Sequence, residues 1–180
     1  SASVIGGKRY LCYNGGFFYF AGHAGDLAIA PDSMSTATLA NATWAFVAGT
    51  WDGTNNLKLY KNGLQVSSTN IGNLITADDT KVYLAPAKSF AWQNWYSGRI
   101  DEPLIFSRCL GAAELLSLYN GGVGRYGDTN SAPWNNLLHI GWRLDENTGT
   151  NAAAYRSTGF TNSYMALSGA SWTNGVVPLP

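Results

Sequence analysis

Three pairs of adjacent carboxylates are the best candidates for acid–base catalysis. They are Asp78-Asp79, Asp101-Glu102 and Asp145-Glu146. Hydrolysis of a glycosidic bond needs two carboxyl groups roughly 5–9 Å apart across the sugar ring. Adjacent residues of a strand point to opposite faces, so no single dipeptide supplies such a pair. The sequence has no Glu-x-Asp-x-x-Glu run, and we therefore expect a protein that is not an enzyme.

The two histidines and the two cysteines show no catalytic or metal-binding spacing. His23 and His139 lie far apart, and neither accompanies a nucleophile motif such as Gly-x-Ser-x-Gly. We expect one histidine in a surface loop and one in a strand. Cys12 and Cys109 are too few for a disulfide scaffold and lack zinc-site spacing. They form either one bridge in an oxidising compartment or two separate thiols.

A run of aromatic and amide residues is the best candidate for binding chemistry. Trp92, Gln93, Asn94, Trp95 and Tyr96 follow one another in the chain. Sugar recognition uses flat aromatic faces with hydrogen-bonding groups beside them. We therefore expect Trp92, Gln93, Asn94 and Tyr96 to bind a ligand. The alternative interpretation, open for Trp92, is that these tryptophans fill the core.

The composition indicates the kind of fold that must position these residues. The chain has 180 residues, of which 46% are hydrophobic, 12% are charged and 21 are Gly. Helix formers are scarce and β-branched residues are plentiful, which favours an all-β fold. Lys plus Arg equals Asp plus Glu at 11 each, so we expect no nucleic-acid partner. No apolar run approaches ~18 residues, so we expect no membrane insertion.

Short strand patterns separated by turn residues predict a series of hairpins. Asn14-Gly15-Gly16 lies between strand patterns at 8–13 and 17–21 and predicts the first turn. The run 44–51 is typical of a buried strand. Trp44 in this run and Trp142 in a later alternating run are both expected in the core.

The clearest strand pattern follows a turn at 52–56. Residues 57–61 alternate, which predicts apolar side chains inward and basic ones outward. Asn62-Gly63 predicts a type I′ turn before a return strand at 64–68. Residues 111–119 predict the one short helix, ending at Asn120-Gly121-Gly122.

Two segments carry a resemblance to a known family. The first joins 44–53 to 57–63, and the second runs from Gly98-Arg99-Ile100-Asp101-Glu102 through the helix to Asn120-Gly121-Gly122. Together they resemble the LamG-like jelly-roll family of the concanavalin A-like lectin/glucanase superfamily. The resemblance implies an antiparallel β-sandwich, or jelly roll, with one short helix near 111–119. Pro103 departs from the usual β-branched residue, which suggests an edge or bulge position.

The end of the chain is similar to the beginning of the same family. The residues that carry this similarity are Gly141 to Thr150, Ser168-Gly169-Ala170 and Trp172 to Gly175. We therefore expect a sandwich body at 1–122, a linker or long loop at 123–136, and opening strands at 137–180. The opening strands would complete this sandwich, a neighbouring copy or a following repeat.

The resemblance also implies a function and a metal. It implies a non-catalytic surface or adhesion module that binds carbohydrate or an extracellular polymer, at a cell or virion surface. The alternative is a structural subunit of a surface layer, filament or virion fibre, self-associating by strand exchange or standing beside tandem domains. A structural Ca²⁺ with Asp101 as ligand is implied by the family. Otherwise Asp101-Glu102 form a strand-end turn that binds loop amides.

Overall fold

The computed structural model describes part of the chain. The described residues are 2–3, 9–14, 17–22, 34–35, 43–54, 56–70, 98–122, 138–142, 144, 148, 150–157 and 164–166. They form antiparallel sheets and one α-helix, which confirms the predicted fold class.

The strands are β1 (Ala2–Ser3), β2 (Arg9–Asn14), β3 (Phe17–Gly22), β4 (Met34–Ser35), β5 (Val47–Trp51), β6 (Asn56–Lys61), β7 (Leu64–Asn70), β8 (Leu104–Phe106), β9 (Leu138–Trp142), β10 (Asn151–Ser157) and β11 (Tyr164–Ala166). The α-helix is α1 (Ala112–Tyr119), and a 3-10 turn, η1 (Asn120–Gly122), follows it. Contacts divide the chain into a first unit, Ser1–Ser97 with Cys109–Gly122, and a second unit, Gly98–Arg108 with Val123–Pro180.

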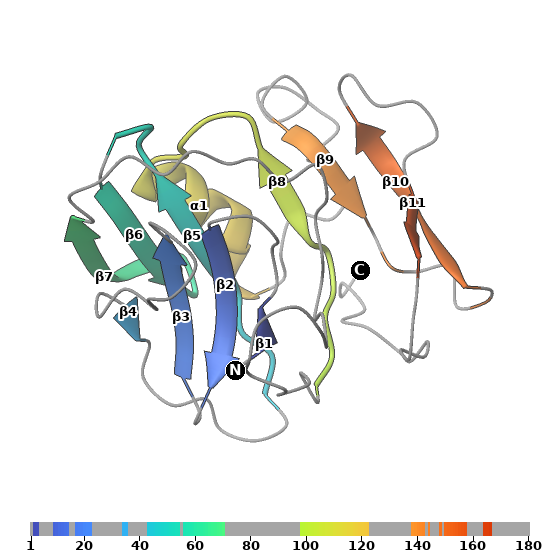
Figure 1. Ribbon diagram of the computed structural model, residues 1–180, viewed down its shortest axis with the longest axis horizontal. Helices are drawn as coiled ribbons and strands as arrows, with labels where there is room; N and C mark the ends of the chain where they lie inside the picture. Colours follow the sequence, from blue (N-terminus) through green and yellow to red (C-terminus); the bar gives the residue numbers. More distant parts are fainter. Residues whose placement is uncertain are drawn as a thin grey trace. The chain divides into compact units, whose positions relative to one another are not determined.

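The first unit contains two antiparallel sheets, in the orders β1-β2-β3-β4 and β5-β6-β7. β3 lies against β6, and β4 lies against β6 and β7, so the two sheets pack on each other. In Figure 1 the blue strands β2 and β3 lie over the green strands of the second sheet. Asn14 pairs with Phe17, which confirms the first predicted hairpin.

The hairpin between β6 and β7 confirms the predicted type I′ turn. Asn62 and Gly63 have φ of 51° and 77°, and both must be positive in this turn. Asn62 also binds the chain before β5. Its backbone N–H donates to the Phe46 carbonyl at 2.8 Å, and its Oδ1 accepts from the Phe46 N–H at 3.1 Å.

The inward face of the β5–β7 sheet follows from the alternation in β6. Leu57 and Leu59 are fully buried, whereas Lys58 between them is exposed. Val47 and Trp51 of β5 pack against the two leucines. Full burial of one such leucine side chain is worth about 1.5–3 kcal/mol.

Trp44 corrects one sequence prediction. The buried strand expected over 44–51 begins only at Val47, and Trp44 is 44% exposed. Val47 pairs with Lys61, the last residue of β6. Phe46 therefore meets the turn residue Asn62, and the chain before it extends past the end of its partner strand. The core position expected for Trp44 is consequently wrong.

The helix confirms the prediction for 111–119 and explains a close approach to the hairpin. The Glu114 carboxylate accepts from the Gly111 N–H at 2.8 Å at the start of α1. Asn120 ends the helix in the left-handed conformation, with φ of 47°. A Cβ on Gly63 would lie 2.8 Å from Leu116 Cδ1 and 3.0 Å from its Cα. Glycine at 63 therefore lets the turn and α1 come into contact.

The second unit holds one antiparallel sheet in the order β11-β10-β9-β8. β9 pairs with β8, with Ile140 opposite Ile105. Trp142 is 5% exposed in a cluster with Ile140 and Ala152, which confirms its predicted core position. His139 lies in β9, as expected for a strand histidine. Residues 98–108, which we expected in the first body, are grouped here with the end of the chain.

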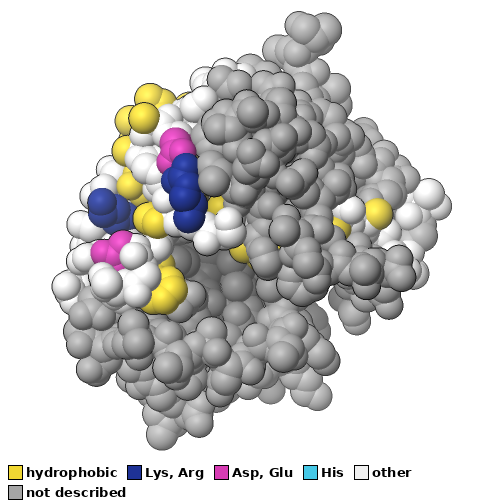
Figure 2. Space-filling model, turned by 90° about the horizontal axis from the view of Figure 1, so that it is seen from above, with side chains coloured by type: hydrophobic (Ala, Val, Ile, Leu, Met, Phe, Trp, Pro, Cys, Tyr) yellow, Lys and Arg dark blue, Asp and Glu magenta, His cyan; other side chains and the backbone are white. Residues whose placement is uncertain are grey.

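The described surface carries both charges. On the face shown in Figure 2, basic and acidic side chains lie next to each other among hydrophobic and uncharged ones. Among the helices of the described residues, none is long and apolar enough to cross a membrane.

Candidate functional site

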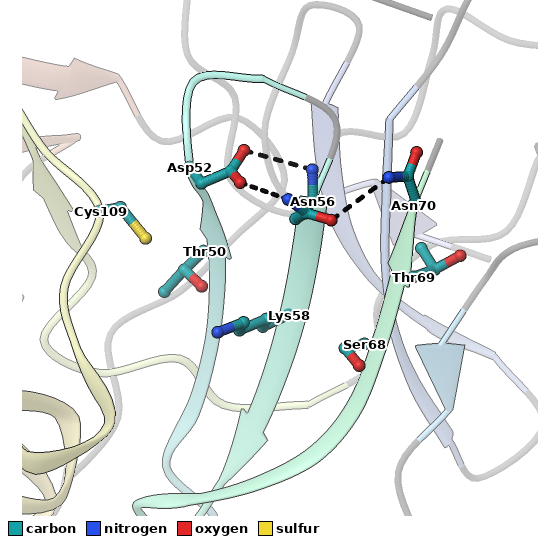
Figure 3. A pocket seen from close by; sticks show the side chains of 8 residues that line it. All are labelled: Thr50, Asp52, Asn56, Lys58, Ser68, Thr69, Asn70 and Cys109. Carbon is teal, nitrogen blue, oxygen red and sulfur yellow. Dashed lines mark hydrogen bonds between the residues drawn. The ribbon is translucent and has the colours of Figure 1, made fainter. Parts of the chain in front are cut away.

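A polar hollow of about 450 Å³ lies in the first unit, on the face of the β5–β7 sheet opposite Leu57 and Leu59 (Figure 3). β5, β6 and β7 supply most of its lining, and the segment before α1 supplies one residue. The lining residues are Thr50, Asp52, Asn56, Lys58, Ser68, Thr69, Asn70 and Cys109.

One row of three side chains crosses the floor of this hollow. Thr50 of β5 is the register partner of Lys58 of β6, and Lys58 is the partner of Ser68 of β7. Residues directly opposite each other in a sheet present their side chains on the same face. The row therefore places two hydroxyls on either side of one ammonium group.

Two groups of this row have no partner within the described part of the chain. Thr50 is 8% exposed, and its Oγ1 is buried without a hydrogen bond. The exposed Lys58 ammonium makes neither a hydrogen bond nor an ion pair with a described residue. Buried polar atoms in native proteins are nearly always hydrogen-bonded, so the Thr50 hydroxyl needs an explanation.

Asp52 organises the turn at the other end of the hollow. Its Oδ1 accepts from Thr54 N at 2.8 Å, Thr54 Oγ1 at 2.7 Å and Asn56 N at 3.2 Å. Its Oδ2 accepts from Asn56 Nδ2 at 2.5 Å. These bonds, with the Asn56 side chain contributing most and Thr54 next, hold the pKa of Asp52 far below its usual range. The carboxylate is therefore ionised at neutral pH.

A chain of amides continues from Asp52 across the sheet. Asn70 Nδ2 donates to Asn56 Oδ1 at 3.4 Å, and Asn56 is the register partner of Asn70. Because its oxygen accepts and its nitrogen donates, the Asn56 amide has one orientation. The amide row lies two residues along the strands from the row that holds Lys58.

Cys109 lines the hollow from the segment before α1, as Figure 3 shows. Its side chain is an exposed thiol, and its Sγ donates to the Leu110 carbonyl at 3.8 Å. The thiol form corresponds to the second of the two states that the sequence left open for Cys12 and Cys109.

The predicted ligand-binding residues Trp92, Gln93, Asn94 and Tyr96 lie outside the described residues, as does His23. Their role stays a prediction. The hollow is made of other residues, which the sequence analysis did not single out. The sequence feature that indicates them is the alternation of polar residues with Leu57 and Leu59 in β6.

Asp101, the predicted calcium ligand, is half-buried in the second unit. Its Oδ1 accepts from the Glu102 N–H at 3.1 Å, and Glu102 has a φ of 47°. This is the turn interaction that the sequence offered as the alternative. The described residues bring together no group of three His, Cys, Asp or Glu side chains that fits a metal ion. They do not by themselves fit the ~6–8 oxygens of a Ca²⁺ site, and calcium stays a prediction.

Comparisons with known proteins concern the fold. No curated protein sequence matches the chain significantly. A similar solved structure is the crystal structure of an S-layer domain-containing protein (residues 221–444) from Clostridium thermocellum ATCC 27405. Its TM-score is 0.40 at 22% sequence identity, and the match covers 62% of this chain and 55% of that chain. The match thus spans about half the length of that relative.

The family comparison covers more than half of the chain. The family model described as the concanavalin A-like lectin/glucanases superfamily matches residues 4–116. These residues include β2 to β7 of the first unit, the polar hollow and the first five residues of α1. The chain belongs to the concanavalin A-like lectin/glucanases superfamily.

Proposed function

We propose that this chain is a non-catalytic carbohydrate-binding module and that the polar hollow is its binding site. The observation that carries this proposal is the buried Thr50 hydroxyl, which lines the hollow without a hydrogen-bond partner. Its Oγ1 has almost no accessible surface, so a sugar hydroxyl would satisfy it once the Thr50 side chain rotates this oxygen into the hollow. The Lys58 ammonium, the Ser68 hydroxyl and the Asn56 amide supply further hydrogen-bonding groups on the same face.

The acidic side chain of the hollow supports binding rather than hydrolysis. Asp52 is the one carboxylate among the described residues that line the hollow, whereas glycoside hydrolysis uses a pair. A general acid also needs a pKa near the working pH, and the hydrogen bonds to Asp52 lower its pKa instead. Asp52 thus shapes the turn and donates no proton.

The polymers that such a module would recognise are exposed outside cells. We therefore propose that the chain acts at a cell or virion surface or in the extracellular space. Its partner would be a surface glycan or another extracellular polymer. Membership of a superfamily that includes lectins supports this proposal.

The test measures polysaccharide binding by a variant that lacks the Thr50 hydroxyl. Thr50→Val keeps nearly the same shape and deletes the unpartnered hydroxyl. We expect binding to a panel of soluble polysaccharides in affinity electrophoresis, and about fivefold weaker binding by Thr50→Val. The variant should unfold at the same denaturant concentration or a higher one, because no hydrogen bond of the unbound protein is lost.

Thr43→Val is the matched control. Thr43 is exposed and does not line the hollow, so the same substitution there should leave binding unchanged. Release of reducing sugars during the assay would contradict the non-catalytic role. Equal binding by the wild type and Thr50→Val would show that the hollow is not the binding site.

The alternative proposal is a structural subunit that self-associates by strand exchange or stands beside tandem domains. Light scattering with and without a calcium chelator distinguishes the two roles. The binding role predicts a monomer. Discrete oligomers would favour assembly, and their loss with chelator would support a Ca²⁺ at Asp101.

A further inference from the structure

Two Asn-Gly steps of the first unit share a backbone conformation and differ in their surroundings. They are Asn62-Gly63, between β6 and β7, and Asn120-Gly121, at the end of α1. Asn62 and Asn120 have φ of 51° and 47°, and the glycines that follow them have φ of 77° and 68°. A difference in reactivity between the two steps would therefore come from their surroundings rather than from the dipeptide or its φ angles.

The reaction open to an Asn-Gly step is loss of the side-chain amide. The glycine nitrogen attacks Cγ of the asparagine, so an N–Cγ bond forms and the Cγ–Nδ2 bond breaks. Ammonia leaves with the proton of the glycine nitrogen, and a cyclic succinimide remains. Water then opens the ring at either carbonyl and gives aspartate or isoaspartate. Glycine favours ring closure because it has no Cβ to hinder the approach.

The structure holds Asn62 away from this reaction. Its Oδ1 accepts from the Phe46 N–H at 3.1 Å, and its backbone N–H donates to the Phe46 carbonyl at 2.8 Å. Gly63 is buried, and a Cβ there would lie 2.8 Å from Leu116 Cδ1. Ring closure would turn the Asn62 Cγ toward the Gly63 nitrogen. This movement would break the side-chain bond to Phe46 and disturb the contact with α1.

Asn120-Gly121 lies in more open surroundings. Asn120, Gly121 and Gly122 are all exposed. Apart from the chain neighbours of Gly121, the described residues place no atom within 4 Å of a Cβ built at this position. Two successive glycines can also change their backbone angles at little cost. The Gly121 nitrogen can therefore approach Cγ of Asn120 without disturbing a packed neighbour.

We propose that Asn120 is a site of spontaneous modification in the folded protein, where it converts to aspartate or isoaspartate, and that Asn62 is protected by the fold. The reactants are the Gly121 nitrogen of the same chain and solvent water. This inference does not depend on the proposed function.

The modification would act on the end of α1. Asn120 is the C-cap, and its backbone N–H donates to the Leu116 carbonyl. Conversion adds a negative charge where the last helix carbonyls already concentrate negative charge, and the described last turn of α1 contains no basic residue. Isoaspartate also adds one methylene to the main chain, which disturbs the left-handed cap. Both products should therefore lower the denaturant midpoint of unfolding.

The test stores the whole chain at mildly alkaline pH and follows the two asparagines by mass spectrometry. Trypsin places Asn62 and Asn120 in separate peptides, 62–81 and 109–125. We expect Asn120 to convert about tenfold faster than Asn62 in the folded protein, and the two to convert at similar rates in denaturant. Equal rates in the folded protein, or faster conversion of Asn62, would overturn the proposal. A tenfold difference that persists in denaturant would overturn the protection assigned to the fold.

Asn120→Gly is the matched variant, because glycine favours the left-handed cap and carries no amide to lose. The unfolding midpoint of the wild type should fall during storage as Asn120 converts, whereas that of Asn120→Gly should stay constant. Asn120→Asp supplies the charge alone, so its midpoint should lie below that of the fresh wild type, by less at high salt. A wild-type midpoint that stays constant after Asn120 has converted would overturn the effect on α1.

Discussion

The two faces of the β5–β7 sheet are built from the same three strands and differ in what they leave unsatisfied. On the inward face, Leu57 and Leu59 are fully buried against Val47 and Trp51. On the outward face, Thr50 and Lys58 carry polar groups that have no partner among the described residues. The inward face is filled by apolar contacts, whereas the outward face holds the polar groups to which we assign the proposed ligand.

Along β6, residues that stabilise the fold alternate with residues that we propose bind the ligand. Residues 57 and 59 of β6 contribute apolar burial, and residues 56 and 58 contribute hydrogen-bonding groups one position away. A substitution on the inward face should change the free energy of unfolding. Substitution of Thr50 or Lys58 on the outward face should change binding and leave unfolding nearly unaltered.

The largest expected effect comes from the inward face. Leu59→Ala should lower the free energy of unfolding by about 2–5 kcal/mol, because it leaves a cavity at a fully buried site. Denaturant unfolding followed by tryptophan fluorescence measures this change. The adjacent Lys58→Met should change stability by less than about 0.5 kcal/mol. Similar losses for both variants would show that the two faces are not separate.

The next effect concerns the turn that joins β6 and β7. Gly63→Ala should cost about 2–4 kcal/mol, since φ is 77° and the new Cβ would meet Leu116 at 2.8 Å. The same unfolding measurement applies. Gly53→Ala is the control, because Gly53 has φ of 87° and open space around its Cβ position. An equal cost for both variants would mean that backbone strain, and not α1, decides the effect.

Much of this sheet could be predicted from the sequence, because strand alternation and turn chemistry are local. The Asn62-Gly63 turn, the buried leucines and the helix that ends at Asn120 all follow from neighbouring residues. Trp44 could not be placed in this way. Its exposure depends on where β6 ends, which is a pairing between distant segments.

The polar hollow could not be predicted because its register depends on a bulge. A two-residue turn at Asn62-Gly63 would place Ser67 opposite Lys58. The ladder shifts between Leu59 and Tyr60, so Ser68 is opposite instead. One unpaired residue of β7 thereby moves every later side chain to the other face. The strand pattern alone does not reveal this shift.

The smallest expected effect is a pH dependence of the free energy of unfolding. It tests whether the ionised Asp52 stabilises the turn beside the outward face. The hydrogen bonds lower the pKa of Asp52 below the ordinary aspartate value of about 3.9, so they favour its ionised form. Their contribution to stability is present above that pH and is lost as the pH falls through the lower value of the folded state. Because Asp52 is exposed, solvent screening keeps the contribution small.

Asp52→Asn removes this contribution with little change in size. Its amide would face the Asn56 amide nitrogen donor to donor, so the variant should be less stable than the wild type at neutral pH. The difference between the two unfolding midpoints should shrink as the pH is lowered from 6 to 2. A difference that stays constant over this range would show that the turn does not depend on the charge. Asp52 would then hold the turn as a hydrogen-bond acceptor, whether or not it carries a charge.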